Sequence, residues 1–341
     1  MPNFDGGHYF LSTLAPIRVG SPADLPPEEW KKYGGDPRES FLKRAQRALS
    51  IMATALQSPA TQAIGVNSPF SKSLRTHLCR FVILEDAVYN GRRSANPLSS
   101  VDPLVPQSVD QLPCPYLMFV VDFDAVTRPG EPLPETLTEE EQDEIRDDYL
   151  KEMWKQGSAE LLKVYENCQD FDAEKVKTPA DFAAYIGKCQ IDTWMSFNDY
   201  YIDPPSLYTL PKWPPIIGIG VPLVASIVFF LAWILRFDVV IGLPTLATAI
   251  VAFLAFAVIT YLAYRFVLNR GQTAWPAAKD SDLPSVLKGL YLQQKFSDFV
   301  VDNQGVSDTD LHKSFGKFLD SHKPGDVLDP ETTQSPGVIK S

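Results

Sequence analysis

Residues 216–235 (IIGIGVPLVASIVFFLAWIL) and 239–264 (VVIGLPTLATAIVAFLAFAVITYLAY) are two long stretches without a charged side chain. A helix of about 20 apolar residues crosses the hydrocarbon core of a bilayer, whereas a helix in a soluble core keeps a polar stripe. Between the stretches, only Arg236 and Asp238 carry charge. The sequence therefore predicts a hairpin of two transmembrane helices, although Pro222 and Pro244 also permit a re-entrant hairpin that dips in from one leaflet.

The charges that flank the hairpin predict its orientation. Lys212 precedes the first stretch, and Arg265, Arg270 and Lys279 follow the second. Positive side chains next to membrane spans collect on the cytoplasmic side, and two crossings return the chain to the side it left. The sequence thus predicts an integral, multi-pass membrane protein with both termini in the cytoplasm. Its three parts are a soluble domain (1–205), a membrane anchor (206–270) and a helical tail with an extended end (271–341).

The net negative charge of the chain indicates which kinds of partner it can bind. The formal net charge is −11, whereas a protein that binds nucleic acid neutralises phosphates with a basic surface. We therefore expect the lipid bilayer and not nucleic acid as a partner. The four cysteines lack CxxC spacing, which is typical of buried thiols in a reducing compartment. The sequence also lacks the Walker, GxGxxG, GxSxG and HExxH motifs of the large nucleotide-binding and hydrolase classes.

The part before the anchor alternates strand-like and helix-like patterns. Strands are predicted at residues 8–15, 76–85, 115–124 and 192–201, and helices at 38–57, 136–168 and 178–187. Apart from the short third helix, this order is the β-α-β-β-α-β pattern of a ferredoxin-like domain, an α+β fold. Such a sheet has antiparallel neighbours in the order 4-1-3-2, with both long helices on one face. Its open face needs a cover, either from the amphipathic tail helices predicted at 282–302 and 308–322 or from the sheet of a second copy in a homodimer.

Polar strand residues form the candidate site. His77, Arg80, Asp122 and Asp124 are the candidate catalytic residues, and His8 is a candidate ligand-binding residue. In the predicted sheet, the end of the third strand lies beside the starts of the first two, which gathers these residues at one end. Alternation along the strand places Arg80 on the open face, beside Asp122 or Asp124. His77 then meets the carboxylates only around the end of the sheet or through a bulge.

This set is compatible with several kinds of chemistry. A carboxylate beside His77 would make an acid–base pair, with Arg80 holding an anion. Two histidines and a carboxylate would instead hold a metal ion, and a single histidine would ligate haem. The non-functional alternative is a cross-strand ion pair of Arg80 with an aspartate. Arg92 and Arg93, in the connection after the second strand, would bind an anionic substrate or a lipid headgroup, or simply lie in solvent.

The segments THLCRFVILED (76–86) and YLMFVVDFDA (116–125) give the chain a resemblance to dye-decolorising peroxidases and other bacterial ferredoxin-like α/β-barrel proteins. In those relatives a strand that starts His-x-x-Arg, as at His77 and Arg80, is followed by an apolar strand that ends in Asp. The resemblance implies peroxidase-like activity with haem as the cofactor. Dye-decolorising peroxidases also have a second ferredoxin-like half with the proximal haem histidine, and a GxxDG motif. This sequence contains neither.

Two functions remain as expectations. The first is a membrane-anchored cytoplasmic module that binds a protein partner, or assembles, at the bilayer surface. The alternative is a membrane-tethered oxidoreductase or peroxidase-like enzyme that acts on a lipid-derived or peroxide substrate. The amphipathic tail and the missing catalytic motifs favour the module, whereas the polar strand ends and the resemblance favour the enzyme.

Overall fold

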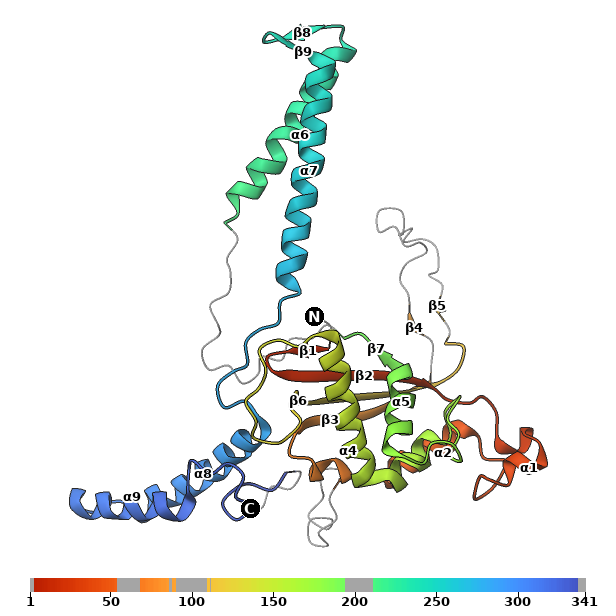
Figure 1. The fold of residues 1–341 in the computed structure, drawn as a ribbon, viewed down its shortest axis with the longest axis vertical. Coiled ribbons are helices and arrows are strands. Elements are labelled where there is room, and N and C mark those ends of the chain that lie inside the picture. Colours follow the sequence, from red (N-terminus) through yellow and green to blue (C-terminus); the bar gives the residue numbers. More distant parts are fainter. Residues whose placement is uncertain are drawn as a thin grey trace. The chain divides into compact units, whose positions relative to one another are not determined.

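The computed structural model of the 341-residue chain describes residues 3–53, 68–85, 88–89, 109–110, 112–193 and 211–336. These residues form two compact units, which are described separately (Figure 1). One unit is the apolar hairpin, with described residues 211–275. The other is a mixed α+β unit that combines the described residues before 194 with those after 275.

A five-stranded antiparallel sheet is the centre of the α+β unit. Its strands are β1 (Phe4–Asp5), β2 (His8–Pro16), β3 (Thr76–Leu84), β6 (Tyr116–Asp124) and β7 (Gln190–Ile191). β6 lies between β2 and β3, while β1 and β7 both pair with β2, which gives the order β7–β2–β6–β3 along the sheet. β7 ends before the strand predicted at 192–201, of which residues 194–201 lie outside the described residues. A separate pair joins β4 (Val88–Tyr89) to β5 (Val109–Asp110).

Alternate residues of β3 and β6 form the packed face of the sheet. Cys79 lies opposite Val121 and Phe81 opposite Phe119, as the alternation predicts. The helices α4 (Glu139–Tyr165) and α5 (Pro179–Cys189) cross this face (Figure 1). On α4, the ring of Tyr149 stacks on that of Phe123, with centroids 3.8 Å apart. These aromatic and aliphatic side chains exclude water and form the core of the unit.

Local signals in the sequence account for the helix starts. Thr138 and Thr178 each form a capping box with the acidic residue three positions later, which satisfies the first amides of α4 and α5. α4 is kinked at Gly157, where a Cβ atom would come within 2.9 Å of Pro69. Pro69 begins the short helix η2 (Pro69–Lys72), which leads into β3. The remaining helices of this region are η1 (Pro22–Asp24), α1 (Pro27–Trp30) and α2 (Phe41–Ile51), which packs against α4.

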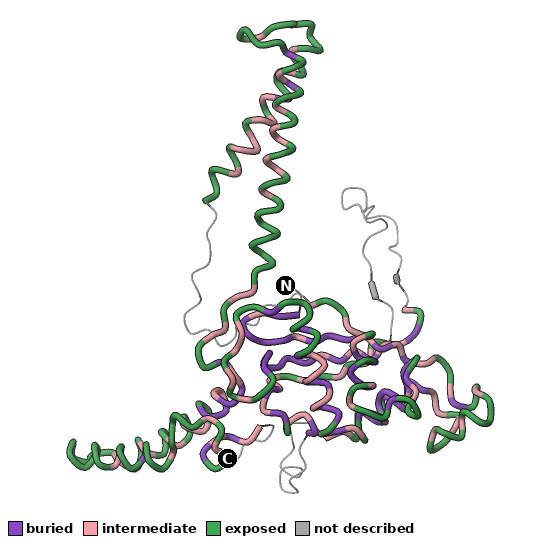
Figure 2. Tube along the Cα trace, viewed as in Figure 1, coloured by how far each residue is buried: buried purple, intermediate pink, exposed green. Residues whose placement is uncertain are grey.

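The tail forms the two predicted helices. They are α8 (Leu283–Asp302), with Asp282 as its N-cap, and α9 (Asp308–His322). Phenylalanine rings hold the two helices together, for example Phe299 and Phe318 with centroids 5.2 Å apart. The start of α8 is buried against the rest of the α+β unit, whereas its later turns and α9 are largely exposed (Figure 2).

The apolar unit is a helical hairpin of α6 (Trp213–Ile234) and α7 (Thr245–Gly271). The helices have 22 and 27 residues, long and apolar enough to span a membrane, and they fit a two-span membrane protein. The predicted start of the second span at residue 239 is wrong, because β8 (Val239–Val240) and β9 (Leu243–Pro244) form a tight turn there with Gly242 at a φ of 75°. Most residues of α6 and α7 are exposed or half-buried (Figure 2), as expected for helices that face lipid.

Candidate metal centre

Three strand ends meet at one end of the sheet, and each brings a metal-ligating side chain. His8 begins β2 and lies opposite Asp124, the last residue of β6. On the other side of β6, the ladder with β3 is irregular between Thr76 and Leu78, so that His77 is the extra residue of a bulge. A bulge redirects a side chain out of the regular alternation. His77 therefore reaches the same carboxylate as His8.

The Oδ1 atom of Asp124 lies between the two imidazoles. It is 2.7 Å from Nε2 of His77 and 3.3 Å from Nδ1 of His8. The rings meet edge to face with centroids 4.9 Å apart, and one ligand atom from each of the three residues lies within 4.8 Å of the other two. The three side chains are at most 4 % exposed. The structure thus brings His8, His77 and Asp124 together in one buried cluster.

The segment that follows the anchor completes this cluster. The backbone N–H of Leu283 donates to Oδ2 of Asp124 at 2.9 Å. The hydroxyl of Ser281 lies 3.4 Å from Nε2 of His8 and donates to the carbonyl of Ala278. The tail therefore supplies a hydrogen bond to the second carboxylate oxygen and a partner for the second nitrogen of His8. The sequence predicted the helix start at 282 but did not connect it with the site.

Burial and hydrogen bonds set the charges in the cluster. Burial lowers the pKa of His8, and the opposing effect of Asp124 does not fully offset this. Burial alone would raise the pKa of Asp124, but the hydrogen bonds from His77, His8 and the Leu283 amide together hold it below its ordinary value. At neutral pH, His8 is therefore neutral and Asp124 is ionised. These are the forms in which histidine and aspartate bind metal ions.

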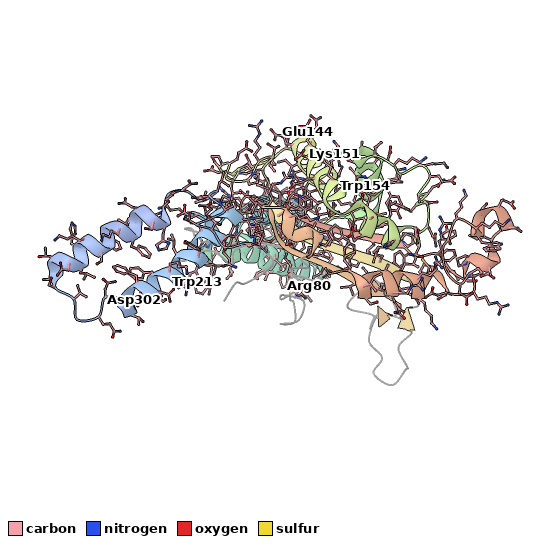
Figure 3. All side chains as sticks on the ribbon, turned by 90° about the horizontal axis from the view of Figure 1, so that it is seen from below. Arg80, Glu144, Lys151, Trp154, Trp213 and Asp302 are labelled. Atoms are coloured by element: carbon pink, nitrogen blue, oxygen red, sulfur yellow. The ribbon has the colours of Figure 1, made fainter. Side chains whose placement is uncertain are left out.

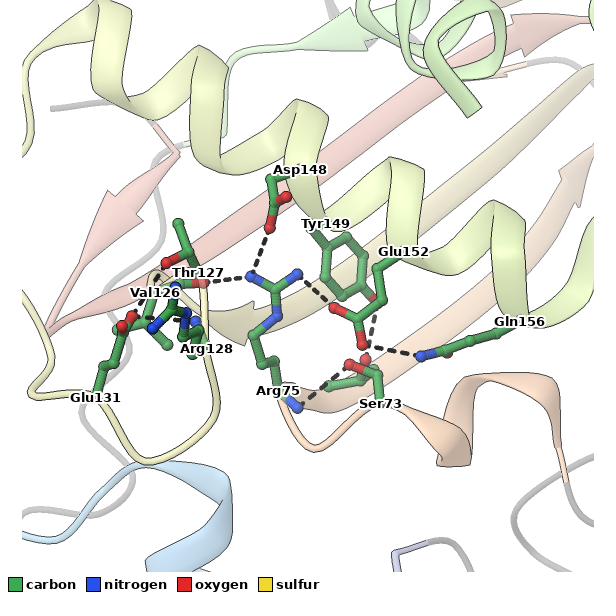
Figure 4. Close-up of polar contacts among 11 residues, drawn as sticks. Ser73, Arg75, Val126, Thr127, Arg128, Glu131, Asp148, Tyr149, Glu152 and Gln156 are labelled. Carbon is green, nitrogen blue, oxygen red and sulfur yellow. Dashed lines mark hydrogen bonds and ion pairs between the residues drawn. The ribbon is translucent and has the colours of Figure 1, made fainter. Parts of the chain in front are cut away.

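A buried arginine fixes the two strand ends that carry His77 and Asp124. The side chain of Arg75 is fully buried, and its guanidinium donates to the carbonyl of Val126, to Asp148 at 3.2 Å and to Glu152 at 2.5 Å (Figure 4). Its backbone carbonyl accepts from the amide of Asp124 at 2.9 Å. Arg75 therefore ties the start of β3 and the end of β6 to α4. No pattern in the sequence singled out Arg75.

The other candidate residues do not join the cluster. Arg80 is exposed on the side of the sheet away from α4 (Figure 3) and lies opposite Val120. Its expected place beside an aspartate is wrong, because the observed register pairs Leu78, two residues before Arg80, with Asp122. Among the described residues, no carboxylate forms an ion pair with Arg80. Asp122 is buried between Phe10 and Leu78. Arg92 and Arg93 lie outside the described residues.

A cavity of about 350 Å³ borders the cluster on the side of β3. His77 forms part of its wall, together with residues from the end of α2, from η2 and from β3. Its volume is within the range of small-molecule sites in proteins. A ligand in this cavity would contact one of the candidate metal ligands.

The cluster fits a single ion better than haem. An axial histidine presents one nitrogen to an iron at the centre of a wide porphyrin. Here Nδ1 of His8 and Nε2 of His77 both face the same carboxylate oxygen, and Nε2 of His8 faces Ser281. The two rings are only 4.9 Å apart, which leaves no room for a porphyrin between them. The donor set and its spacing suit a small cation.

Comparison with known proteins adds no family to this description. No family model, curated protein or solved structure matches the chain. The resemblance to dye-decolorising peroxidases remains a prediction, and the chemistry of the site follows from the geometry of its own residues.

Proposed function

We propose that this protein is a membrane-anchored metalloenzyme that holds one divalent transition-metal ion between His8, His77 and Asp124. The observation that carries the proposal is the convergence of two imidazole nitrogens on one buried carboxylate oxygen. Such a set of two histidines and a carboxylate binds Fe(II) in non-haem oxygenases and, with glutamate in the place of aspartate, Zn(II) in metalloproteases.

The spacing of the donor atoms supports this assignment. An ion with bonds of about 2.1 Å to neighbouring ligands at right angles holds those ligand atoms roughly 3 Å apart. The separations of 2.7 Å and 3.3 Å from Asp124 Oδ1 to the two histidines lie on either side of this value. All three ligand atoms lie within 4.8 Å of one another, so the two histidines would move inward to bind the same ion.

The hydrogen bond of Ser281 gives a second, independent argument. Its hydroxyl donates its one proton to Ala278, so that it can accept from Nε2–H of one tautomer of His8. In that tautomer Nδ1 of His8 directs a lone pair at Oδ1 of Asp124, whereas the other tautomer donates Nδ1–H to this oxygen. A metal ion would select the first tautomer, because it would bind the lone pair of Nδ1. Burial lowers the pKa of His8, so its imidazole is neutral and can bind a metal ion.

The proposed reaction is an oxidation. Three protein ligands leave other coordination positions for a substrate and an oxidant, which is the arrangement of non-haem Fe(II) enzymes. We infer an oxidoreductase that uses dioxygen or a peroxide, in agreement with the enzymatic alternative expected from the sequence. Zn(II) would support hydrolysis instead, and the metal found in the protein as purified, before any ion is added, distinguishes the two.

The setting of this enzyme is also part of the proposal. The strand order and the antiparallel pairing support a ferredoxin-like class for the α+β unit. The positive side chains Lys212, Arg265 and Arg270 at the ends of the hairpin support a cytoplasmic location for both termini. The metal centre would then act on the cytoplasmic side of the bilayer.

Metal analysis of the purified chain tests the proposal. The full chain, in detergent, is loaded with Fe(II) or Zn(II) without oxygen, and bound metal is measured by mass spectrometry after removal of excess ion. We expect about one ion per chain, lost in His77→Ala and Asp124→Asn. His312→Ala removes an exposed histidine of α9 and should retain the ion. Metal-free wild-type protein, or equal binding by all the variants, would refute the metal centre.

A second candidate function follows from a different observation. The helices α8 and α9 leave Phe296, Val300 and Phe315 partly exposed, and the open face of the sheet exposes Leu78 and Val82. Exposed apolar surfaces of this kind often bind partners. They support the first expectation from the sequence, a module that binds a protein partner or pairs through its sheet into a homodimer. The mass of the detergent-solubilised protein tests this function, because a monomer that Val82→Asp leaves unchanged would exclude pairing through the sheet.

A further inference from the structure

The cavity beside His77 has a mostly apolar wall. Its volume is about 350 Å³, and it lies between the end of α2, η2 and β3. The principal apolar residues of its wall are Leu49, Met52, Phe70, Cys79 and Phe81. Apart from His77, none of the described residues that line it has an acidic or a basic side chain of the Asp, Glu, Lys, Arg or His type.

The hydroxyl groups of the wall are engaged within the protein. The hydroxyl of Ser71 donates to the carbonyl of Ser68 at 2.6 Å, and the hydroxyl of Ser68 accepts from the amide of Phe70. The hydroxyl of Thr76 lies 2.8 Å from that of Tyr149. Burial raises the pKa of Cys79, so its thiol is neutral. A ligand in this cavity would therefore find apolar contacts and few hydrogen-bond partners.

We propose that the cavity binds the hydrocarbon chain of a lipid-derived substrate and brings one end of that chain to the metal ion held by His77. This inference rests on the proposed function and names its substrate class. Burial of an apolar chain against leucine, methionine and phenylalanine is favourable, whereas a charged group would lose its hydration without compensation. The apolar hairpin supports the choice of a lipid, because a protein held at a bilayer meets such chains at high local concentration.

Photo-crosslinking tests the location of the chain. The probe is dodecan-1-ol with a diazirine in its chain, added to the full protein in detergent, and labelled peptides are identified by mass spectrometry. We expect labels on peptides that contain Met52, Phe70 or Cys79, reduced by excess unlabelled dodecan-1-ol. Met52→Trp fills the cavity and should lower this labelling about tenfold. Ile51→Trp is the matched control, because Ile51 is 69 % exposed and is not part of this wall.

A magnetic measurement tests the approach to the metal. The fluorine signal of a terminally fluorinated dodecan-1-ol should broaden in the Mn(II)-loaded protein but not in the Zn(II)-loaded protein, and Met52→Trp should abolish the difference. Equal labelling of both tryptophan variants, or labels outside the wall, would overturn the cavity assignment even if metal binds. Labelling of the wall in a chain that binds no metal would instead refute the metalloenzyme and, with it, the role of the chain as a substrate of that metal.

Discussion

The backbone amide of Leu283 donates a hydrogen bond to Oδ2 of Asp124 across 159 positions of sequence, at 2.9 Å. The apolar hairpin lies between these two residues in the chain. The carboxylate ends β6, and the amide belongs to the first residue of α8, which begins 12 residues after α7 ends at Gly271. The candidate metal centre is therefore assembled from residues on both sides of the anchor. Such outer hydrogen bonds orient ligands and tune their affinity for metal.

Leu283→Pro should weaken metal binding about tenfold to a hundredfold. Proline removes the amide donor, yet it is favoured at the first position of a helix. Asp282 before it already has the extended ψ of 147° that a following proline requires. The dissociation constant for Fe(II), measured by competition with a chelator, gives the result. Leu283→Ala is the matched control, since it loses the same side chain but keeps the amide, and an equal loss in both variants would contradict the role of the hydrogen bond.

Arg75→Met should lower the free energy of unfolding of the α+β unit by about 3 kcal/mol. The change removes the donors to Val126, Asp148 and Glu152. The expected loss of stability is near the lower end of the range for broken buried ion pairs, because the carboxylates of Asp148 and Glu152 are partly exposed. Denaturant unfolding followed by intrinsic fluorescence measures the loss. Arg128→Met is the control, because Arg128 is an exposed arginine of the neighbouring loop. If Arg75→Met lowers the free energy of unfolding no more than Arg128→Met does, the buried hydrogen bonds of Arg75 add little stability.

The helices and strands of this fold could be predicted from the sequence because the patterns that define them are local. The strands at 8–15, 76–85 and 115–124 and the tail helices at 282–302 and 308–322 agree with the structure to within one residue at each end. Alternating apolar residues and Ser, Thr or Asp caps define such elements without reference to the rest of the chain. The hairpin is likewise predictable from the length of its two apolar stretches and their lack of charge. Only the start of the second helix differs, because the turn at Gly242 and Pro244 places the first residue of α7 at Thr245.

The site was only partly accessible, because it depends on irregular and distant contacts. Strand order placed His8 near Asp124, but strict alternation put His77 and Asp124 on different faces. The bulge at His77 overcomes this, and no single residue in the sequence marks it. The contacts of Ser281 and Leu283 cross the whole anchor, and no local pattern predicts which strand end a tail helix will meet.

The stability of the metal-free protein should fall as the pH is lowered below about 6.5. The pKa of His8 is depressed in the folded protein from its ordinary value of 6.5, so the unfolded chain takes up a proton first and is favoured. The pKa of Asp124 is also depressed in the folded protein from its ordinary value of 3.8. Its protonation in more acidic solution therefore lowers the free energy of unfolding further, for the same reason. Melting temperatures between pH 7.5 and 5 measure the first effect. His8→Gln should flatten this part of the profile, while His312→Gln, which changes an exposed histidine, should leave it unchanged.

The full chain should remain with the membrane pellet after alkaline carbonate and enter solution only with detergent. α6 and α7 expose apolar side chains along nearly their entire length, which water would not tolerate. Replacement of residues 213–271 by a flexible Gly/Ser linker of about 15 residues should yield a soluble protein. Because the linker keeps Ser281 and Leu283 joined to the α+β unit, this variant should also bind metal as the full chain does. Release of the intact protein by carbonate would contradict the membrane anchor, whereas a soluble linker variant without metal would show that the hairpin is needed to bring the tail to Asp124.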